Sequence, residues 1–142
     1  MTRNKGFTLI ELMVVILIVA ILAAVIVPML RARIDAAKWS EGRAGIGTIS
    51  TAARAFWAEH QDQAVMPGPT MAQLFPIQTD LDGKYFTYAC YQITYQAYDT
   101  TNVAYTITCT AGASTRTAGV PTAPATMTLT VAANGSSVWS QT

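Results

Sequence analysis

An uninterrupted apolar run near the amino terminus constrains this chain more than any other feature. The sequence from Leu12 to Val27 contains sixteen consecutive apolar residues. As an α-helix, residues 7–30 would be about 36 Å long, and the hydrocarbon core of a membrane is about 30 Å thick. The run continues into Pro28 and has no small-residue cleavage site after it, so it differs from a removable secretory signal. It therefore predicts a helix that spans a membrane.

Glu11 is the only charged residue between Lys5 and Arg31. A carboxylate at the centre of a membrane helix costs about 2.5–3.5 kcal/mol, and less near an end, so such a residue is a candidate functional site. A plainer interpretation leaves Glu11 solvated at the level of the lipid headgroups. If the carboxylate is paired instead, its cation must come from the chain's own terminus or from another molecule.

The residues around Glu11 resemble a known amino-terminal motif. Lys-Gly-Phe-Thr-Leu-Ile-Glu-Leu at residues 5–12, followed by the apolar run and a proline, is similar to the start of type IV pilins and of the related pseudopilins of type II secretion. The resemblance implies a leader, residues 1–6, that a prepilin peptidase cuts between Gly6 and Phe7, and N-methylation of Phe7. The cut creates a positive amine, which the resemblance pairs with Glu11 of a neighbouring subunit during assembly.

The same resemblance implies partners and a location. The expected partners are further copies of the chain in a helical filament, the prepilin peptidase and methyltransferase, the inner-membrane assembly platform, and the inner membrane before assembly. The leader is expected in the cytoplasm and the carboxyl-terminal domain outside it, first on the inner membrane and then in a cell-surface filament or a periplasmic pseudopilus. A type IV pilin serving adhesion or motility is the preferred interpretation, and a type II secretion pseudopilin acting in protein export is the alternative. The aspartate-rich calcium-binding end and the Asp-Pro-Trp-Gly type segment of major secretion pseudopilins are missing.

Beyond the apolar run the sequence keeps a helical period. Ile46, Ile49 and Ala53 recur at intervals of three and four, which predicts an amphipathic continuation and a single helix over residues 7–61. Such a helix would be about 82 Å long, so it is expected to protrude from any compact domain of this size. Pro28 removes a hydrogen bond and predicts a helix break, which the resemblance extends to local melting of residues 20–28 in a filament.

The remaining sequence predicts an α+β fold. Strands are expected over residues 85–94, 103–110 and 127–131, and Asn134-Gly135 indicates a hairpin that returns through Val138 and Trp139. The amphipathic half of the helix is expected to pack on this small antiparallel sheet. The predicted parts are the following: the cleaved leader 1–6, the transmembrane and filament-core half-helix 7–30, the amphipathic half-helix 31–62, and the β-rich headpiece 63–142.

Two cysteines, Cys90 and Cys109, flank the middle of the first predicted hairpin. A symmetric turn at residues 98–102 would place them opposite each other, and this predicts a disulfide bond in a domain outside the cytoplasm. Two free buried thiols are the alternative. Many pilins instead have a bridge near the carboxyl end.

Composition and residue patterns argue against several other functions. A formal net charge of +1 gives no electrostatic reason to expect nucleic acid as a partner. No paired nucleophile and base, no metal-ligand cluster and no cofactor motif is visible, so neither an enzyme nor a bound metal or cofactor is predicted. Asp80 and Asp82 resemble the start of a calcium loop, but the later ligands are missing and a turn is favoured. His60, alone beside Glu59, is expected to cap the helix or face solvent.

Overall fold

A computed structural model describes residues 6–60, 68–98, 103–113 and 119–142. The chain divides into two compact units, residues 1–34 and 35–142. Each unit is described by itself below, and helix α1 contributes to both.

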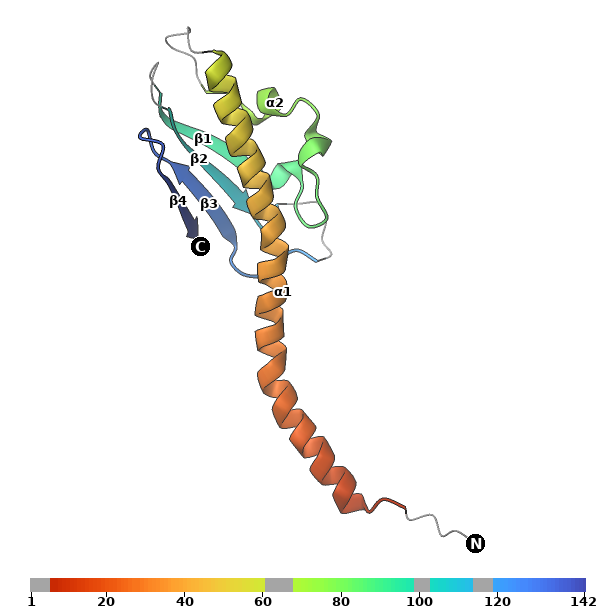
Figure 1. The fold of residues 1–142 in the computed structure, drawn as a ribbon. Coiled ribbons are helices and arrows are strands. Elements are labelled where there is room, and N and C mark those ends of the chain that lie inside the picture. The colour runs from red at the N-terminus through yellow and green to blue at the C-terminus, as the bar shows by residue number, and fades with distance from the viewer. Residues whose placement is uncertain (1–5, 61–67, 99–102, 114–118) are drawn as a thin grey trace. The chain divides into compact units, whose positions relative to one another are not determined.

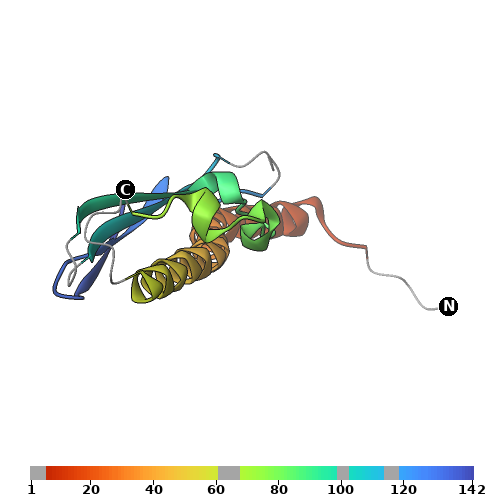
Figure 2. The same cartoon turned by 90° about the horizontal axis from the view of Figure 1, so that it is seen from above.

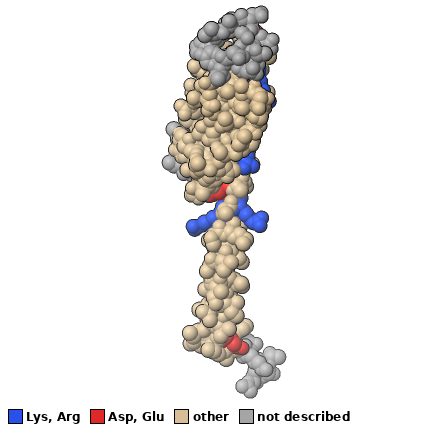
Figure 3. Space-filling view, turned by 90° about the vertical axis from the view of Figure 1, so that its left-hand side faces the viewer, with Lys and Arg blue, Asp and Glu red and all other residues tan. Residues whose placement is uncertain are grey.

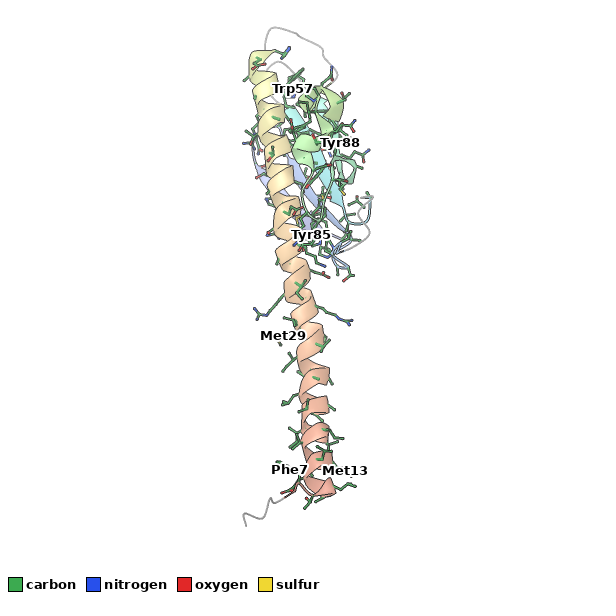
Figure 4. The ribbon with its side chains drawn as sticks, turned by 90° about the vertical axis from the view of Figure 1, so that its right-hand side faces the viewer. Phe7, Met13, Met29, Trp57, Tyr85 and Tyr88 are labelled. Atoms are coloured by element: carbon green, nitrogen blue, oxygen red, sulfur yellow. The ribbon has the colours of Figure 1, made fainter. Side chains whose placement is uncertain are left out.

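The long amino-terminal helix predicted from the sequence is confirmed. Helix α1 spans Leu9–Glu59, so it begins two residues later and ends two residues earlier than expected. Within the first unit its apolar side chains are exposed and are not covered by other described residues, as the sticks at Met13 and Met29 illustrate in Figure 4. An 18-residue window of this helix has a mean hydropathy of 3.3 and none of it is buried, so by length and composition the helix is able to cross a membrane.

Pro28 lies inside this helix and does not interrupt it. The predicted break is therefore not present in the single chain. Proline removes one backbone donor and crowds the preceding turn. The neighbouring residues keep the rest of the ladder, so the helix tolerates the loss. Melting of residues 20–28 within a filament stays a prediction.

The second unit contains one four-stranded antiparallel sheet, drawn in green to blue in Figure 1. The strands are β1 (Tyr91–Tyr98), β2 (Val103–Thr110), β3 (Thr126–Val131) and β4 (Ser137–Gln141), and their order in the sheet follows the chain. Figure 2 shows the sheet on one side of the carboxyl-terminal half of α1. Alternate residues of β2 and β3 are buried toward the helix, and the threonines between them form the outer face.

The hairpin predicted at Asn134-Gly135 is confirmed. Gly135 has φ +80°, a conformation that favours glycine, and its N–H donates to the carbonyl of Ala132. The Asn134 side chain accepts from the N–H of Ser136 at 3.0 Å. This turn sets the register between β3 and β4.

The first strand differs from the prediction. It was expected over residues 85–94, but β1 begins at Tyr91, and the preceding residues form a loop and the short 3-10 helix Tyr88–Cys90. Two more short elements also escaped prediction, a helix at Met71–Leu74 and a 3-10 helix at Gln78–Leu81.

The core of the headpiece lies between the sheet and the helix. Trp39, Ile46, Ile49 and Ala53 are buried on the helix side, which confirms the apolar face predicted from the period. The following buried residues complete the cluster: Phe86, Tyr91, Tyr105, Ile107, Cys109, Met127, Leu129 and Val131. Ser50 is also buried, and its hydroxyl lies 2.9 Å from the hydroxyl of Tyr105.

The glycines of α1 differ in what surrounds them. A Cβ atom on Gly42 would lie 2.9 Å from Cε3 of Trp39, and one on Gly45 would overlap the phenol of Tyr91. A Cβ atom on Gly47 would contact nothing within 4 Å. Two of the three glycines are therefore explained by close packing of the helix against the headpiece.

This difference predicts opposite effects for two matched substitutions. Gly47→Ala is expected to stabilise the headpiece by about 0.5–1 kcal/mol, because alanine favours helix and meets no obstacle. Gly45→Ala is expected to destabilise it by about 1–3 kcal/mol, because the buried Tyr91 must move. Denaturant unfolding of the full chain in detergent, followed by tryptophan fluorescence, measures both changes. Equal shifts in the two variants would contradict the packing argument.

Candidate functional site

The amino-terminal site begins with three residues that precede the helix. Gly6, Phe7 and Thr8 are exposed, and Phe7 is 90% exposed. A Cβ atom on Gly6 would contact nothing within 4 Å among the described residues, so no packed side chain covers this face of the predicted cleavage point. Accessibility of this peptide bond is the first requirement for a protease.

Thr8 and Glu11 form a capping box at the start of α1. The Thr8 N–H donates to Oε2 of Glu11 at 2.8 Å, and the Thr8 hydroxyl donates to the same oxygen at 2.7 Å. In return the Glu11 N–H reaches the Thr8 hydroxyl oxygen at 3.4 Å. This is the reciprocal pattern of a Thr-x-x-Glu helix start, which satisfies backbone donors that have no partner within the helix.

The capping box gives Glu11 a local role that the sequence interpretation missed. The carboxylate also lies in the first turn of the helix, where the positive end of the helix dipole favours an anion. The Glu11 carboxylate thus accepts two hydrogen bonds from Thr8. Thr8 directly follows Phe7, the residue whose amine cleavage would release. Its pairing with that amine in a neighbouring subunit stays a prediction.

A second cluster of polar contacts joins the loop that precedes β3 to helix α1. Asp35 is 8% exposed and accepts a hydrogen bond from the Thr122 N–H at 3.1 Å and another from the Thr122 hydroxyl. Lys38 lies 3.7 Å from the other carboxylate oxygen, and Trp39 donates from Nε1 to the carbonyl of Pro124. The hydrogen bond from the Thr122 hydroxyl is the main reason why the pKa of Asp35 lies below its usual value.

Asp35 is therefore expected to make headpiece stability fall in acid. A carboxyl group whose folded pKa is depressed contributes stability above its unfolded pKa of about 3.9, and this contribution is lost as pH falls through the lower folded value. Asp35→Asn removes this titration and keeps an acceptor for Thr122. Unfolding measured between about pH 6 and pH 2 should show a steeper loss for the wild type than for the variant. Parallel curves of stability against pH for the wild type and the variant would contradict this role of Asp35.

Glu41 anchors another loop in the same way. Its Oε1 accepts hydrogen bonds from the backbone N–H groups of Tyr85 and Phe86, at 2.8 and 2.9 Å. The chain near Asp82 is held by a similar contact, because Oδ1 of Asp82 accepts from the N–H of Tyr88 at 2.9 Å. Asp82 thus serves a turn, as the sequence favoured. No group of three metal-ligating side chains occurs among the residues described.

Cys90 and Cys109 lie near each other but not directly opposite. Cys109 pairs with Tyr91 in the β1–β2 ladder, and Cys90 is the last residue of the short 3-10 helix before β1. The predicted register was wrong by one residue because the ladder closes at Tyr98 and Val103 and contains an irregularity between Tyr95 and Ala97. The prediction assumed equal numbers of residues on both sides of the turn, so it could not account for the irregularity between Tyr95 and Ala97.

Both cysteines are buried free thiols in the structure, and the disulfide stays a prediction. Burial, and then the neighbouring Cys90, raise the pKa of Cys109 to about 12. The Cys109 thiol therefore stays protonated at neutral pH, and the thiolate needed for disulfide exchange is scarce.

The intact mass of the chain isolated from cells decides the state of the two cysteines. A bridged chain is expected to be lighter by two hydrogens, and to regain them on reduction. Masses that agree with and without reductant would establish free thiols. Labelling with an alkylating reagent before and after unfolding separates buried free thiols from bridged ones.

His60 closes the carboxyl end of α1. Its Nδ1 lies 2.8 Å from the carbonyl oxygen of Phe56, and its ring stacks on the Phe56 ring at 4.1 Å. This arrangement matches the capping role expected for a histidine at a helix end. It brings no nucleophile to the ring among the described residues.

Comparisons with known proteins address the amino-terminal site. The family model described as the prokaryotic N-terminal methylation motif matches residues 1–27. The chain is 42% identical over 57 residues to the type IV major pilin protein PilA of Myxococcus xanthus (strain DK1622), a match that covers 40% of this chain and 26% of the relative. It is 46% identical over 50 residues to the type II secretion system core protein G of Pseudomonas aeruginosa, which covers 35% of each chain. No solved structure matches.

The chain therefore carries the prokaryotic N-terminal methylation motif at its amino terminus. It is related there to type IV pilins and to type II secretion pseudopilins, and the resemblance predicted from the sequence is confirmed. The matched part spans only about a quarter to a third of the length of these relatives. The family model ends at residue 27 and so does not reach the headpiece.

Proposed function

We propose that this chain is the structural subunit of a type IV pilus filament, assembled through its amino-terminal helix after prepilin peptidase cleavage. The observation that carries the proposal is a capped apolar helix, exposed on every side, whose first part belongs to a methylation motif. A soluble monomer rarely leaves an apolar surface of this extent uncovered. Lipid covers it before assembly, and the equivalent helices of other subunits cover it in the filament.

Each part of the chain then has its own task. Cleavage between Gly6 and Phe7 removes the cytoplasmic leader, residues 1–6, and methylation follows at Phe7. Residues 7–30 hold the precursor in the inner membrane and later form the filament core. Residues 31–62 support the headpiece, residues 63–142, which faces the outside. The partners are further copies of the chain, the prepilin peptidase and methyltransferase, and the inner-membrane assembly platform.

The proposed role is structural and not enzymatic. Both relatives are named as filament or secretion-system components. Three acidic groups of the second unit accept hydrogen bonds from backbone N–H groups, namely Asp35, Glu41 and Asp82. They hold loops in place, which is the role expected of them in a building block.

A type II secretion pseudopilin is the second candidate. The similarity to the secretion system core protein G supports it, since that match extends over 35% of the relative, against 26% for the pilin. The two candidates share the amino-terminal site and differ in the length and location of the filament. A pseudopilin filament would stay in the periplasm and act in protein export.

Electron microscopy of fibres sheared from the cell surface separates the candidates. The proposal expects abundant long filaments whose mass-spectrometric peptides include this chain, beginning at a methylated Phe7. Deletion of the chain should remove the filaments and leave protein secretion unchanged. An absence of surface filaments together with a secretion defect on deletion would support the pseudopilin. A mature chain that begins upstream of Phe7 would overturn both.

A further inference from the structure

Strand β4 forms an edge of the sheet that no described strand pairs on its far side. All five of its residues are exposed, and Val138 and Trp139 are 64% and 45% exposed. Exposed edge strands usually carry a charge, a proline or a bulge that prevents them from pairing with other chains. Strand β4, with the sequence Ser-Val-Trp-Ser-Gln, has no charge and no proline, and its register with β3 runs without a shift.

The ladder with β3 determines which backbone groups face the free edge. Thr126 and Thr142 exchange both backbone hydrogen bonds, and the Ala132 N–H donates to the Ser136 carbonyl. Hydrogen-bonded pairs alternate along an antiparallel ladder, so Val138 and Ser140 also bond to β3. The N–H and C=O groups of Ser137, Trp139 and Gln141 therefore point away from the sheet, in a row.

We propose that β4 of one copy pairs antiparallel with β4 of a second copy, centred on Trp139. In this register Trp139 lies opposite Trp139 of the second copy, and Ser137 lies opposite its Gln141. All six outward backbone groups of each strand are then satisfied. The pairing is symmetric about a twofold axis, so each strand presents to its partner the same surface that it receives.

The charge distribution favours a second copy as the occupant. Figure 3 views the molecule from the side of β4, and the surface over the sheet shows Lys, Arg, Asp and Glu only near its margins. Two identical charged edges would repel each other, whereas two uncharged ones do not. An uncharged hydrogen-bonding edge also has nothing with which to select a charged partner.

The geometry indicates which copies meet. Residues 35–59 of α1 pack along the sheet, and a twofold axis perpendicular to the sheet reverses their direction in the second copy. Subunits of one helical filament have parallel helices, so this contact would join two filaments that run in opposite directions. Five residues on each side are fewer than the roughly 20 of a stable interface, so many weak contacts must act together along the filaments. This use of the contact rests on the proposed function, whereas the pairing itself does not.

Disulfide trapping of the full chain in detergent tests the register. Val138 of one copy and Ser140 of the other would form a non-hydrogen-bonded pair, whose Cα atoms are about 4.5 Å apart and suit a disulfide. A mixture of Val138→Cys chains and Ser140→Cys chains is expected to form crosslinked dimers, and each variant alone is not. The native cysteines are 3% and 0% exposed and do not compete. A mixture that crosslinks no more than the separate variants overturns the proposal.

Two charge variants provide a matched control. Ser137→Glu/Gln141→Glu places like charges opposite each other twice, and Ser137→Lys/Gln141→Glu places opposite charges there. Arg43 contacts Met127, which lies opposite Gln141 in β3, so its charge would affect a charged residue at position 141. Both variants therefore carry the same change, Gln141→Glu, and differ only at Ser137. In the trapping background the first variant should give about tenfold less dimer than the second. Equal yields overturn the register.

The same variants in cells separate this proposal from the proposed function. Side-by-side filaments are expected for the wild type and for the Lys/Glu variant, and single filaments for the Glu/Glu variant. Single filaments in every strain, with no trapped dimer, overturn the pairing and leave the pilin function intact. Trapped dimers from a chain that makes no filaments support the pairing and overturn the pilin function.

Discussion

Glu11→Ala is expected to leave membrane insertion intact and to abolish or strongly weaken filament assembly. The substitution removes an anion from an apolar helix, so insertion into the membrane becomes easier. If Glu11 pairs in a filament as proposed, the substitution leaves the amine of a neighbouring subunit without its counter-ion. Breaking a buried ion pair in this way costs about 3–5 kcal/mol, which at each subunit contact is enough to stop polymerisation.

The capping box means that Glu11→Ala alone is ambiguous. The same change also removes the acceptor for the Thr8 N–H, and loss of a cap costs about 1 kcal/mol. Glu11→Gln keeps a side-chain acceptor and removes the charge. Thr8→Ala weakens the cap and keeps the charge. If the charge matters, Glu11→Ala and Glu11→Gln fail equally and Thr8→Ala assembles.

Three measurements distinguish the effects of these variants on insertion, cleavage and assembly. Membrane fractionation follows insertion, mass spectrometry follows cleavage at Gly6–Phe7, and the mass of sheared filaments follows assembly. Filaments at normal yield from Glu11→Gln would assign Glu11 to helix capping and remove the ion-pair hypothesis. Failure of cleavage in all three variants would instead place the defect at processing.

The amino-terminal half was predictable because its signals are local. An apolar run of sixteen residues and a helical period of apolar residues each depend on neighbours within a turn or two. The capping box at Thr8 and Glu11 has the same local character. Thr-x-x-Glu before an apolar run is a known helix start, so this part of the site could have been found from the sequence.

The headpiece was predictable in its strands and not in its loops. The alternation in β2 and β3 and the Asn134-Gly135 turn predicted three strands correctly, because these patterns lie within each hairpin. The start of β1 was wrong because Glu41, more than forty residues away, holds the loop at Tyr85 and Phe86 in a non-strand conformation. The burial of Ser50 could not be predicted because its partner, the Tyr105 hydroxyl, is 55 residues away along the chain.

Phe86→Ala is expected to be the most destabilising change within the headpiece. The Phe86 side chain is fully buried, its ring centroid is 4.9 Å from that of Trp39, and one of its ring atoms would lie 3.3 Å from a Cβ atom on Gly42. Removing a phenylalanine from a core costs about 3–5 kcal/mol, depending on how well the surroundings collapse. Collapse is hindered here, because Glu41 accepts a hydrogen bond from the Phe86 N–H at 2.9 Å and so holds this loop in place.

Ile77→Ala is the matched control, because Ile77 is 61% exposed and lies, like Phe86, between α1 and β1. Its expected effect is within about 0.5 kcal/mol. Denaturant unfolding of the full chain in detergent, followed by the loss of sheet circular dichroism, measures both variants. Since small domains are stable by only about 5–15 kcal/mol, Phe86→Ala should unfold at much lower denaturant concentration. A loss below about 1.5 kcal/mol would mean that Trp39 and Tyr91 close the cavity, and that Glu41 does not hold the loop rigidly.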